Sequence, residues 1–332
     1  MKSIICLDTM FQDFYIALLK YIVQFLEFFM KFTPLSVTDY KSIKSFFHNQ
    51  QYRLSSYSLL SLIVWSNQTL QTHYTIEDNV LILGNKSIKR PETNHLFLPL
   101  SPTQNITPEY CAIIAKKSGF DHMWFVPEDF LLQCDRREVD TYFTVTEQTE
   151  FDDYVYLSED LMNLKGKKYI RQRNLIHQFD KKYVQKGKVN VELINHTNTP
   201  ACLNFLQKWC EIRDCNLEEN EELACEKLAT VNTLNNFDAL EAMGILIRIG
   251  GEVSAFGICS HLTDTMGVLN FEKAYPDIKG LYQFLDNECA KRLFAGYTYI
   301  NKESDMNIPN LAQSKKSYNP VMMIKSYCLT LR

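Results

Sequence analysis

The chain has 332 residues, of which 46% are hydrophobic and 22% charged, and its formal net charge at pH 7 is −4. This length allows two domains with separate cores, and the composition excludes a disordered chain. The small negative charge excludes a global field that would attract nucleic acid or an anionic membrane. Binding to either partner must therefore depend on a local basic patch.

Ten cysteines and seven histidines are dispersed along the chain, without any C-x-x-C motif. A disulfide framework or a zinc site would need these residues to be clustered. We therefore expect no metal site, and we expect reduced thiols packed as small hydrophobic side chains in a cytoplasmic protein.

The first segment, residues 1–29, contains most of an apolar stretch at 11–30, FQDFYIALLKYIVQFLEFFM. The pattern of a secretory signal is absent, and a membrane span would bury Lys20 and Glu27 at about 2.5–3.5 kcal/mol each. Three interpretations remain: a helix docked on the domain, an extension before a natural start at Met30, or a membrane-surface helix. The first two are favoured, and the third would make the protein membrane-associated through residues 11–30.

Residues 30–163 alternate between strand and helix patterns. A strand at 31–37 precedes a helix capped by Thr38 and Asp39, and a second apolar helix follows at 58–65. Residues 73–85 predict a strand–turn–strand with the turn at 77–79. The remaining predictions are a strand at 96–102, a helix from the cap Thr107 to Gly119, and strands at 141–147 and 152–158.

Residues 189–332 open in the same way, about 158 residues later, with a strand and a helix over 189–209. This faint repeat indicates duplication as a hypothesis. The predicted elements that follow are a helix at 221–237, strands at 243–251, 252–262 and 266–274, a helix at 280–296, a strand at 297–303, a helix at 308–318 and a strand at 321–331. Both halves are α+β units whose strands are mostly joined by hairpins.

A basic connecting helix is predicted between the halves, at 164–188. Tyr169, Ile176, Phe179 and Tyr183 share one helix face that would dock on a domain. The segment carries nine basic residues: 165, 167, 168, 171, 173, 181, 182, 186 and 188. Two interpretations stay open, a solvated linker helix and a ridge that contacts phosphates.

Several stretches resemble a known bacterial family: DLMNLKGKKYIRQRNLIHQF, NFEKAYPDIKGLYQFLDNECA, YINKESDMNIPNLAQSKKSYNP and IKSY. The family is similar to the C-terminal domain of phosphatidylglycerol lysyltransferase, and the resemblance runs from Met30 to the end. It implies two tandem GNAT-like acyltransferase domains with mixed, mostly antiparallel sheets and helices on both faces, as in Fem-type aminoacyltransferases. Ile170 and Asn270 stand where the family often has histidines, so any proton transfer by those histidines differs here.

The resemblance implies transfer of an aminoacyl group from aminoacyl-tRNA, or another activated acyl donor, to a small amine or hydroxyl acceptor, either a lipid headgroup or a peptide-like molecule. We expect the basic ridge to contact the phosphates of tRNA or of a lipid headgroup, through Lys168, Arg171, Arg173 and Asn174. Two alternatives stay open: an acyl-CoA-dependent N-acyltransferase, and a catalytically silent binding module with the same fold.

Acyl transfer needs an uncharged nucleophile, stabilisation of an oxyanion and a proton for the leaving group. The candidate catalytic residues follow two neighbouring predicted strands: Glu272, Lys273, Glu303, Asp305 and Tyr318. Glu303 or Asp305 would be the base, Lys273 and Lys315 would orient or stabilise negative charge, and Tyr318 would protonate a leaving oxygen. Asn301 is a further candidate for substrate binding. The alternative is a structural salt-bridge network of Glu272 and Glu303 with Lys273 and Lys315.

Coenzyme A is disfavoured as a cofactor. GNAT acetyltransferases bind its pyrophosphate on a Gln/Arg-x-x-Gly-x-Gly/Ala loop at a helix N-terminus. The corresponding stretch here is DIKGLY, in which Asp277 and Tyr282 replace the outer positions and only Gly280 fits. We therefore expect no cofactor, although the helix start after Gly280 would suit a single phosphate or carboxylate of a substrate.

Overall fold

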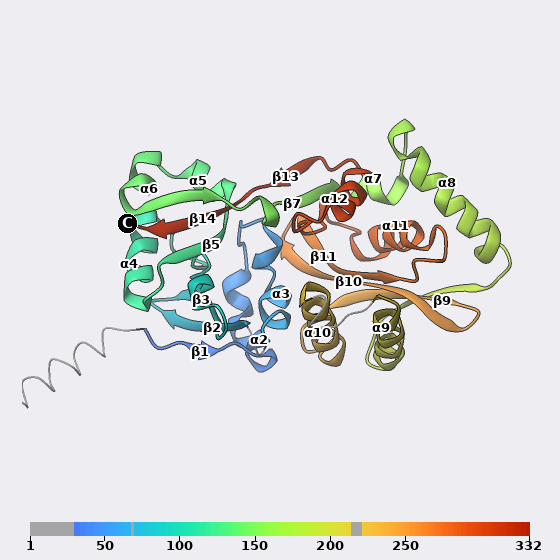
Figure 1. Cartoon of the computed structure of the whole chain (residues 1–332), viewed down its shortest axis with the longest axis horizontal. Helices are drawn as coiled ribbons and strands as arrows, with labels where there is room; N and C mark the ends of the chain where they lie inside the picture. The colour runs from blue at the N-terminus through green and yellow to red at the C-terminus, as the bar shows by residue number, and fades with distance from the viewer. Residues whose placement is uncertain (1–29, 68–69, 214–220) are drawn as a thin grey trace, which may run out of the picture.

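The computed structural model describes residues 30–67, 70–213 and 221–332 (Figure 1). The predicted apolar segment 1–29, and so nearly all of the proposed membrane-contacting stretch, lies outside the described residues. Among the residues described, no helix has the length and apolar character needed to cross a membrane.

Two seven-stranded sheets form the α+β framework. The first sheet has the order β1 (Thr33–Pro34), β2 (Leu70–Glu77), β3 (Val80–Ser87), β4 (His95–Leu96), β5 (His122–Pro127), β14 (Ser326–Leu331), β6 (Phe143–Glu147). The second sheet has the order β8 (Val189–Leu193), β9 (Met243–Ile249), β10 (Glu252–Thr263), β11 (Met266–Ala274), β12 (Tyr299–Asn301), β7 (Asp153–Leu157), β13 (Met322–Ile324). Both sheets are mixed and mostly antiparallel, as expected.

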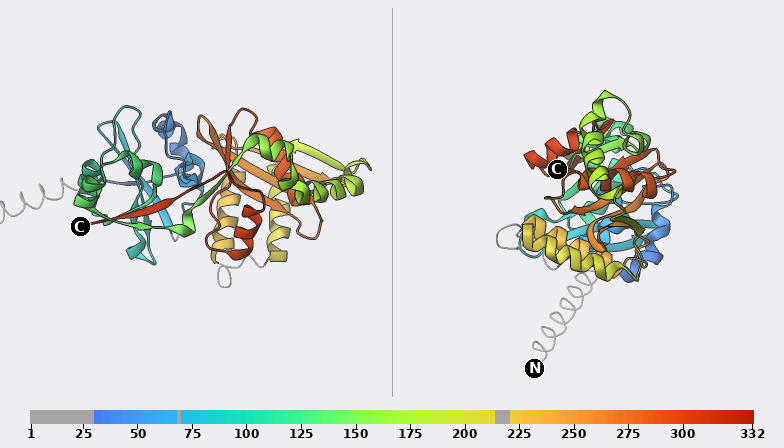
Figure 2. Two further views of the ribbon diagram at one scale, coloured as in Figure 1. Left: turned by 90° about the horizontal axis from the view of Figure 1, so that it is seen from above. Right: turned by 90° about the vertical axis from the view of Figure 1, so that its right-hand side faces the viewer.

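The two sheets repeat one pattern of order and direction. β4 is parallel to β5 in the first sheet, and β11 is parallel to β12 in the second; the other neighbours are antiparallel over the described residues. In each sheet the sixth place is taken by a strand from the other half of the chain. β7 lies between β12 and β13, and β14 lies between β5 and β6. Figure 2 shows the red β14 leaving the second half for the first.

Helices cover both faces of the second sheet (Figure 1). α9 (Thr199–Arg213) and α10 (Glu221–Asn235) lie on one face, and α11 (Leu281–Leu293) lies on the other with α7 (Ser158–Asn163), α8 (Ile170–Phe179) and α12 (Pro309–Lys316). The face of α9 and α10 shares one buried apolar cluster with the first half, whose members run from Leu35 to Leu329. The helices of the first half are α2 (Tyr40–Ile43), α3 (Leu59–Val64), α4 (Pro108–Ser118), α5 (Glu128–Gln133) and α6 (Arg136–Tyr142).

Local signals in the sequence explain several of these elements. The predicted helix after Thr107 is confirmed, because the Thr107 hydroxyl accepts the backbone N–H of Tyr110 at 3.1 Å. Gly119 ends this helix at a φ of 71°. The predicted hairpin is also confirmed: Asp78 and Asn79 form its turn with φ values of 48° and 63°, a conformation that these residue types tolerate.

Other predictions need correction. The single strand predicted at 321–331 is wrong, because Met322–Ile324 pairs with β7 and Ser326–Leu331 pairs with β5 and β6 in the other sheet. The strands predicted at 31–37 and 96–102 shrink to Thr33–Pro34 and His95–Leu96. No elements were predicted for residues 122–140, which form β5, α5 and most of α6. The strand predicted at 141–147 begins two residues too early, because Thr141 and Tyr142 end α6.

The proposed limits of the halves, 30–163, 164–188 and 189–332, stay a prediction. β7 lies within the first of these ranges but pairs in the second sheet, and β14 does the reverse. The connecting segment forms a short 3₁₀ turn at Lys167–Tyr169, then α8, then a π-helical turn at Asp180–Val184.

The connecting helix α8 packs tightly on α11. Tyr169 and Phe179 are fully buried, and the rings of Phe179 and Phe284 lie 4.8 Å apart. Gly280, the residue before α11, has a φ of 85°. A Cβ at this position would lie 2.2 Å from the carbonyl oxygen of Leu175. Gly280 therefore allows the backbones of α8 and the α11 N-terminus to touch.

We expect Gly280→Ala to destabilise the fold by about 3 kcal/mol, since it adds steric overlap to the cost of a left-handed alanine. Gly187 is the matched control, because its φ is 66° and a Cβ there would meet nothing within 4 Å. Gly187→Ala should cost only about 1 kcal/mol. Urea unfolding of both variants measures the difference, and equal losses would contradict the tight docking of α8.

Candidate functional site

The parallel strands β11 and β12 pair over only three residues each. The pairs are Met266↔Tyr299, Gly267↔Ile300 and Val268↔Asn301, after which β11 continues along β10 to Ala274. The chain after β12 instead follows β7, because Lys302 N–H donates to Tyr154 O at 2.9 Å and Tyr154 N–H donates to Glu303 O at 3.2 Å. Most predicted catalytic residues lie beside this divergence of β11 and β12.

A buried ion cluster occupies the α11 side of the divergence. The Nζ atom of Lys302 lies 2.8 Å from Glu272 Oε2 and 2.8 Å from Asp286 Oδ1. The ring of Tyr318 lies 5.2 Å from the same Nζ. Burial lowers the pKa of Lys302, but the charges of Asp286 and Glu272 outweigh burial and hold this pKa well above its usual value. Burial, followed by the charge of Asp286, raises the pKa of Glu272.

Lys273 lies on the opposite face of the sheet, where its side chain meets α9 and α10. It forms an ion pair with Glu226 at 2.6 Å, and its Nζ atom lies 4.6 Å from the ring centre of Trp209. Consecutive residues of a strand point to opposite faces, so Glu272 and Lys273 cannot share one site. The predicted salt-bridge network of Glu272 and Glu303 with Lys273 and Lys315 is therefore wrong in its pairing. Glu272 pairs with Lys302 on the α11 side, and Lys273 pairs with Glu226 on the other face.

Glu303 begins a sharp turn at the end of the divergence. Its backbone adopts a φ of 58°, which is uncommon for a residue with a side chain. Asn301 accepts the Glu303 N–H at 2.7 Å. Lys315 Nζ donates to three backbone carbonyls of this turn, those of Lys302, Glu303 and Ser304, at 2.5, 3.0 and 2.6 Å. Lys315 therefore holds the turn, and its own pKa is lowered by burial.

The side chain of Glu303 points to a chain of polar groups between the halves. Asn270 Nδ2 lies 3.5 Å from Glu303 Oε1 and donates to Ser61 Oγ on α3 at 3.0 Å. Ser260 donates to Asn270 Oδ1 at 2.8 Å. Burial raises the pKa of Glu303 to about 8, with Lys315 opposing the shift and the charges of Asp153 and Glu226 adding to it. A carboxyl group with this pKa can accept a proton near neutral pH.

Asn301 and Asp305 have structural partners. Asn301 is fully buried and donates to Arg53 O at 3.0 Å and to Asp153 Oδ2 at 2.8 Å. Asp305 accepts the Tyr154 hydroxyl at 2.5 Å and the Asn307 N–H at 2.9 Å. The structure thus brings Glu303 close to Asn270 and separates it from Asp305, while Glu272 and Tyr318 belong to the buried ion cluster.

The predicted phosphate ridge lies on the surface. Lys168 pairs with Asp160 at 2.6 Å, and Arg173 donates to the carbonyls of Leu164 and Gly166, the latter at 2.7 Å. Arg171 and Asn174 are exposed. Gly280, the predicted anion seat, is covered by the backbone of α8.

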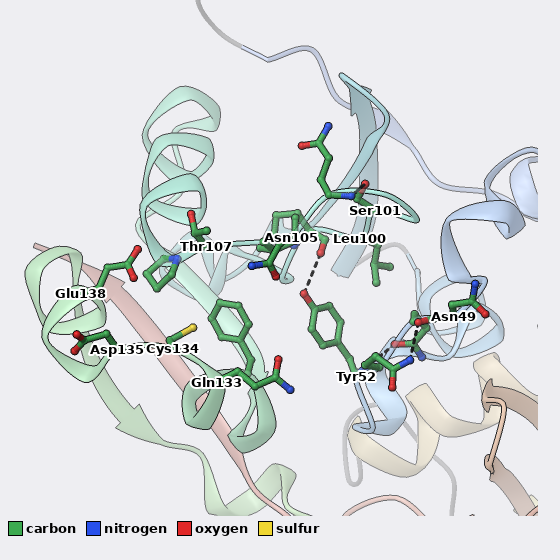
Figure 3. Close-up of a pocket in the computed structure, with 17 residues that line it drawn as sticks. Asn49, Tyr52, Leu100, Ser101, Asn105, Thr107, Gln133, Cys134, Asp135 and Glu138 are labelled. Carbon is green, nitrogen blue, oxygen red and sulfur yellow. Dashed lines mark hydrogen bonds between the residues drawn. The ribbon is translucent and has the colours of Figure 1, made fainter.

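A separate pocket of about 420 Å³ lies in the first half (Figure 3). Its wall includes six amide side chains and the carboxylates of Asp135 and Glu138, with no lysine, arginine or histidine. Tyr52 crosses it and donates its hydroxyl to Pro99 O at 3.2 Å. This pocket was not predicted from the sequence, although the run Asn49, Gln50, Gln51 in its wall was an available signal. Such a wall suits a neutral or cationic molecule and opposes a phosphate.

Sequence reasoning also missed the partners of the predicted residues. We had expected Glu272 to meet Lys273 or Lys315. Instead Lys302 neutralises both Glu272 and Asp286, and Glu226 neutralises Lys273. The alternation of NKE at 301–303 was the available signal, because it places Lys302 on the face opposite to Glu303. Among the described residues no group of histidine, cysteine and acidic side chains could hold a metal ion.

Comparison with known proteins agrees with this architecture. A conserved protein of unknown function from Bacteroides thetaiotaomicron has a solved structure with a TM-score of 0.81 and 26% identity, over 91% of this chain and all of that chain. The C-terminal domain of a protein from Agrobacterium fabrum, named for lysylphosphatidylglycerol synthetase, gives a TM-score of 0.60 at 13% identity, over 88% and 91%. An uncharacterized protein of Mycoplasmoides gallisepticum is 25% identical over 52% of this chain, and the match spans about half of that relative, 54%.

The chain matches the family model for the C-terminal part of phosphatidylglycerol lysyltransferases, which are acyltransferases. The matching region is residues 120–330, which includes the divergence of β11 and β12, the buried ion cluster and the turn of Glu303. The resemblance found in the sequence is therefore confirmed. The chain belongs to the family described as phosphatidylglycerol lysyltransferase, C-terminal.

Proposed function

We propose that the chain transfers an aminoacyl group from aminoacyl-tRNA to an amine or hydroxyl acceptor, and that the acceptor is a lipid headgroup. Family membership supports acyl transfer. The observation that carries the proposal is Glu303, a carboxylate with a raised pKa, held in a strained turn where β11 and β12 diverge. Strained backbone that the surrounding structure holds in place is typical of functional sites.

Glu303 is the base of the proposed reaction. Its carboxylate takes a proton from the acceptor, and the freed oxygen or nitrogen attacks the ester carbonyl carbon of the donor. The ester C–O bond then breaks, and the proton passes from Glu303 to the leaving ribose oxygen, so that the base is regenerated. Asn270 is positioned to orient the carboxylate.

Tandem GNAT-like units are the second part of the proposal. Each sheet contains a parallel strand pair joined through a helix, β4–α4–β5 in the first and β11–α11–β12 in the second. The strands β1–β6 correspond in order to β8–β13, and β7 corresponds to β14. This correspondence supports duplication of one unit with exchange of the last strand.

Coenzyme A is not a donor in this proposal. α8 covers the start of α11 at Gly280, and the pocket beside the start of α4 at Pro108 has an acidic and amide wall. A pyrophosphate needs accessible N–H groups or cations at such a helix start. Exposed lysines of the connecting segment support tRNA contact instead, in particular Lys181, Lys182, Lys186 and Lys188.

We expect Glu303→Gln to lower the rate of aminoacyl transfer by about 10²–10⁴-fold, because an amide cannot accept the proton. The measurement is the transfer of a labelled aminoacyl group from aminoacyl-tRNA into a lipid extract. Asp305→Asn is the control, since Asp305 is engaged by Tyr154, and it should keep most of the activity. A Glu303→Gln enzyme with wild-type rates would refute the proposed base.

The pH profile gives a second prediction for Glu303. Because burial raises its pKa to about 8, the basic form is scarce at low pH. The rate should rise about tenfold per pH unit up to about pH 8 and then level off. Lys315, Asp153 and Glu226 share the electrostatic environment, so profiles of Lys315→Met and Glu226→Gln should show a shifted rise. A flat profile between pH 6 and 8 would contradict the assignment.

Lys302 should be structural and not catalytic. Lys302→Met would leave Glu272 and Asp286 buried together without their cation, and we expect a loss of about 3–5 kcal/mol in the free energy of unfolding. Lys291→Met is the control, since the Lys291 side chain is 47% exposed and its partner Glu288 keeps an ion pair with Arg292 at 2.8 Å, and it should cost less than about 1 kcal/mol. Urea denaturation measures both variants, and a similar small loss in both would exclude a structural role for the cluster.

A further inference from the structure

Exposed apolar side chains gather around α12. The described part of the chain exposes large hydrophobic residues mostly as single positions, but five of them fall between residues 306 and 323: Met306, Ile308, Leu311, Val321 and Met323, each 37–43% exposed. We call these five residues the α12 patch. Clusters of this kind mark interaction surfaces, whereas single exposed hydrophobics need no explanation.

The members of the α12 patch lie on the same face of the second sheet. Ile308 and Leu311 are three residues apart at the start of α12, so they are neighbours on the helix surface. Met323 pairs with Tyr154 across β13 and β7, and the Tyr154 hydroxyl donates to Asp305, next to Met306. Val321 lies just before β13 and extends its pairing with β7, because Val321 N–H donates to Val155 O at 2.8 Å. Side chains two residues apart along such a pairing share a face, so Val321 and Met323 lie on the same side. The patch therefore combines α12 and its two flanks.

Basic side chains border the α12 patch. Gln172 of α8 donates to Ser317 O at 2.7 Å, and Asn319 Nδ2 lies 3.4 Å from Lys168 O, so the start of the connecting segment lies beside the end of α12 (Figure 2). The exposed lysines and arginine in this neighbourhood are Lys165, Lys167, Lys168, Arg171 and Lys316. Asp160 neutralises Lys168, and within the described residues the other four form no ion pair with a carboxylate.

We propose that the α12 patch and its basic border bind the surface of an anionic lipid bilayer. Apolar side chains that enter the boundary between headgroups and acyl chains, flanked by cations that meet anionic headgroups, are the elements of peripheral membrane binding. Because the net charge of the chain is −4, attraction to an anionic surface must come from a local group of cations such as this one. A tRNA would match the cations but would leave the aliphatic side chains without a partner, so the bilayer is favoured for this surface.

This surface is joined to the candidate base. Lys315 on α12 holds the carbonyls of residues 302–304, and Glu303 lies three residues before Met306. A bilayer against α12 would therefore lie beside the backbone of this turn. The Glu303 carboxylate points to Asn270 on the other face of the sheet, so the headgroup of a bound lipid would have to reach past the turn to meet it. The inference deepens the proposed function, and rests on it only in assigning the bound lipid as the acceptor.

The four lysines at the other end of the connecting segment stay separate from this surface. α8 has ten residues and the π-helical turn five more, which at 1.5 Å per residue is about 20 Å of helix. Lys181 and Lys182 lie in the last turn of that length, and Lys186 and Lys188 lie beyond it. Membrane binding at one end and tRNA binding at the other are therefore compatible within one molecule.

The test is co-sedimentation of the full chain with vesicles. We expect binding to vesicles of phosphatidylcholine and phosphatidylglycerol in a 3:1 ratio, and at least tenfold weaker binding to phosphatidylcholine alone. The double variant Ile308→Ser, Leu311→Ser should bind the mixed vesicles about tenfold more weakly. Lys167→Glu and Lys316→Glu should each weaken binding about fivefold or more, and this loss should disappear at high salt.

Matched controls lie on α4, in the first half. Ile113 is 45% exposed and Lys116 is exposed, so Ile113→Ser and Lys116→Glu should leave vesicle binding unchanged. Residues 11–29 are present in every variant, so any binding that they contribute is constant. Equal binding by the double serine variant and the wild type would overturn the proposal, as would equal losses in the α4 controls.

Two further measurements separate this inference from the proposed function. The double serine variant should lose transfer to vesicle lipid but keep the rate with a water-soluble headgroup that lacks acyl chains, whereas Glu303→Gln should lose both. If the chain binds vesicles but transfers nothing, the proposed function fails and the membrane surface stands. If the double serine variant instead weakens tRNA binding in a filter assay as strongly as vesicle binding, the surface serves tRNA and the membrane assignment is wrong.

Discussion

The exchange of one strand between the two sheets is the constraint on which the rest of the structure depends. β7 enters the second sheet and β14 enters the first, so neither half of the chain completes its own sheet. The two crossing segments lie side by side, because Ser326 N–H donates to Asp152 Oδ1 at 2.9 Å and Gln148 N–H donates to Ser326 O at 2.8 Å. A shift of register in either sheet would therefore disturb the other.

The crossing also positions the candidate base. Asp153, the first residue of β7, is buried and accepts hydrogen bonds from Ser55 N–H at 2.6 Å and from Asn301 Nδ2 at 2.8 Å. Asn301 in turn accepts the N–H of Glu303. One line of contacts thus runs from the first half, through the exchanged strand, to the strained turn. This over-determination explains how a left-handed glutamate can persist at the end of β12.

The sequence predicted what depends on neighbouring residues and missed what depends on distant ones. The cap at Thr107, the stop at Gly119 and the turn at 77–79 are local signals, and each was confirmed. The divergence of β11 and β12 could be located because polar residues follow both strands. The destination of β14 could not, since its pattern is the same in either sheet. The partners of Lys273 were missed because they come from α9 and α10, far away in sequence. Lys302, the partner of Glu272, was missed because it was not assigned to the face opposite to Glu303.

The lysines of the chain show why a polyanion must meet the surface and not the divergence. Lys302 is held by two carboxylates, Lys273 by Glu226 and Trp209, and Lys315 by three carbonyls. Recruiting any of them to a phosphate would break a buried interaction, at a cost of several kcal/mol. The exposed cations of 164–188 and Lys316 carry no such cost. The proposed acyl chemistry at Glu303 and the proposed recognition of phosphate would therefore fall to different parts of the second half, joined by α12.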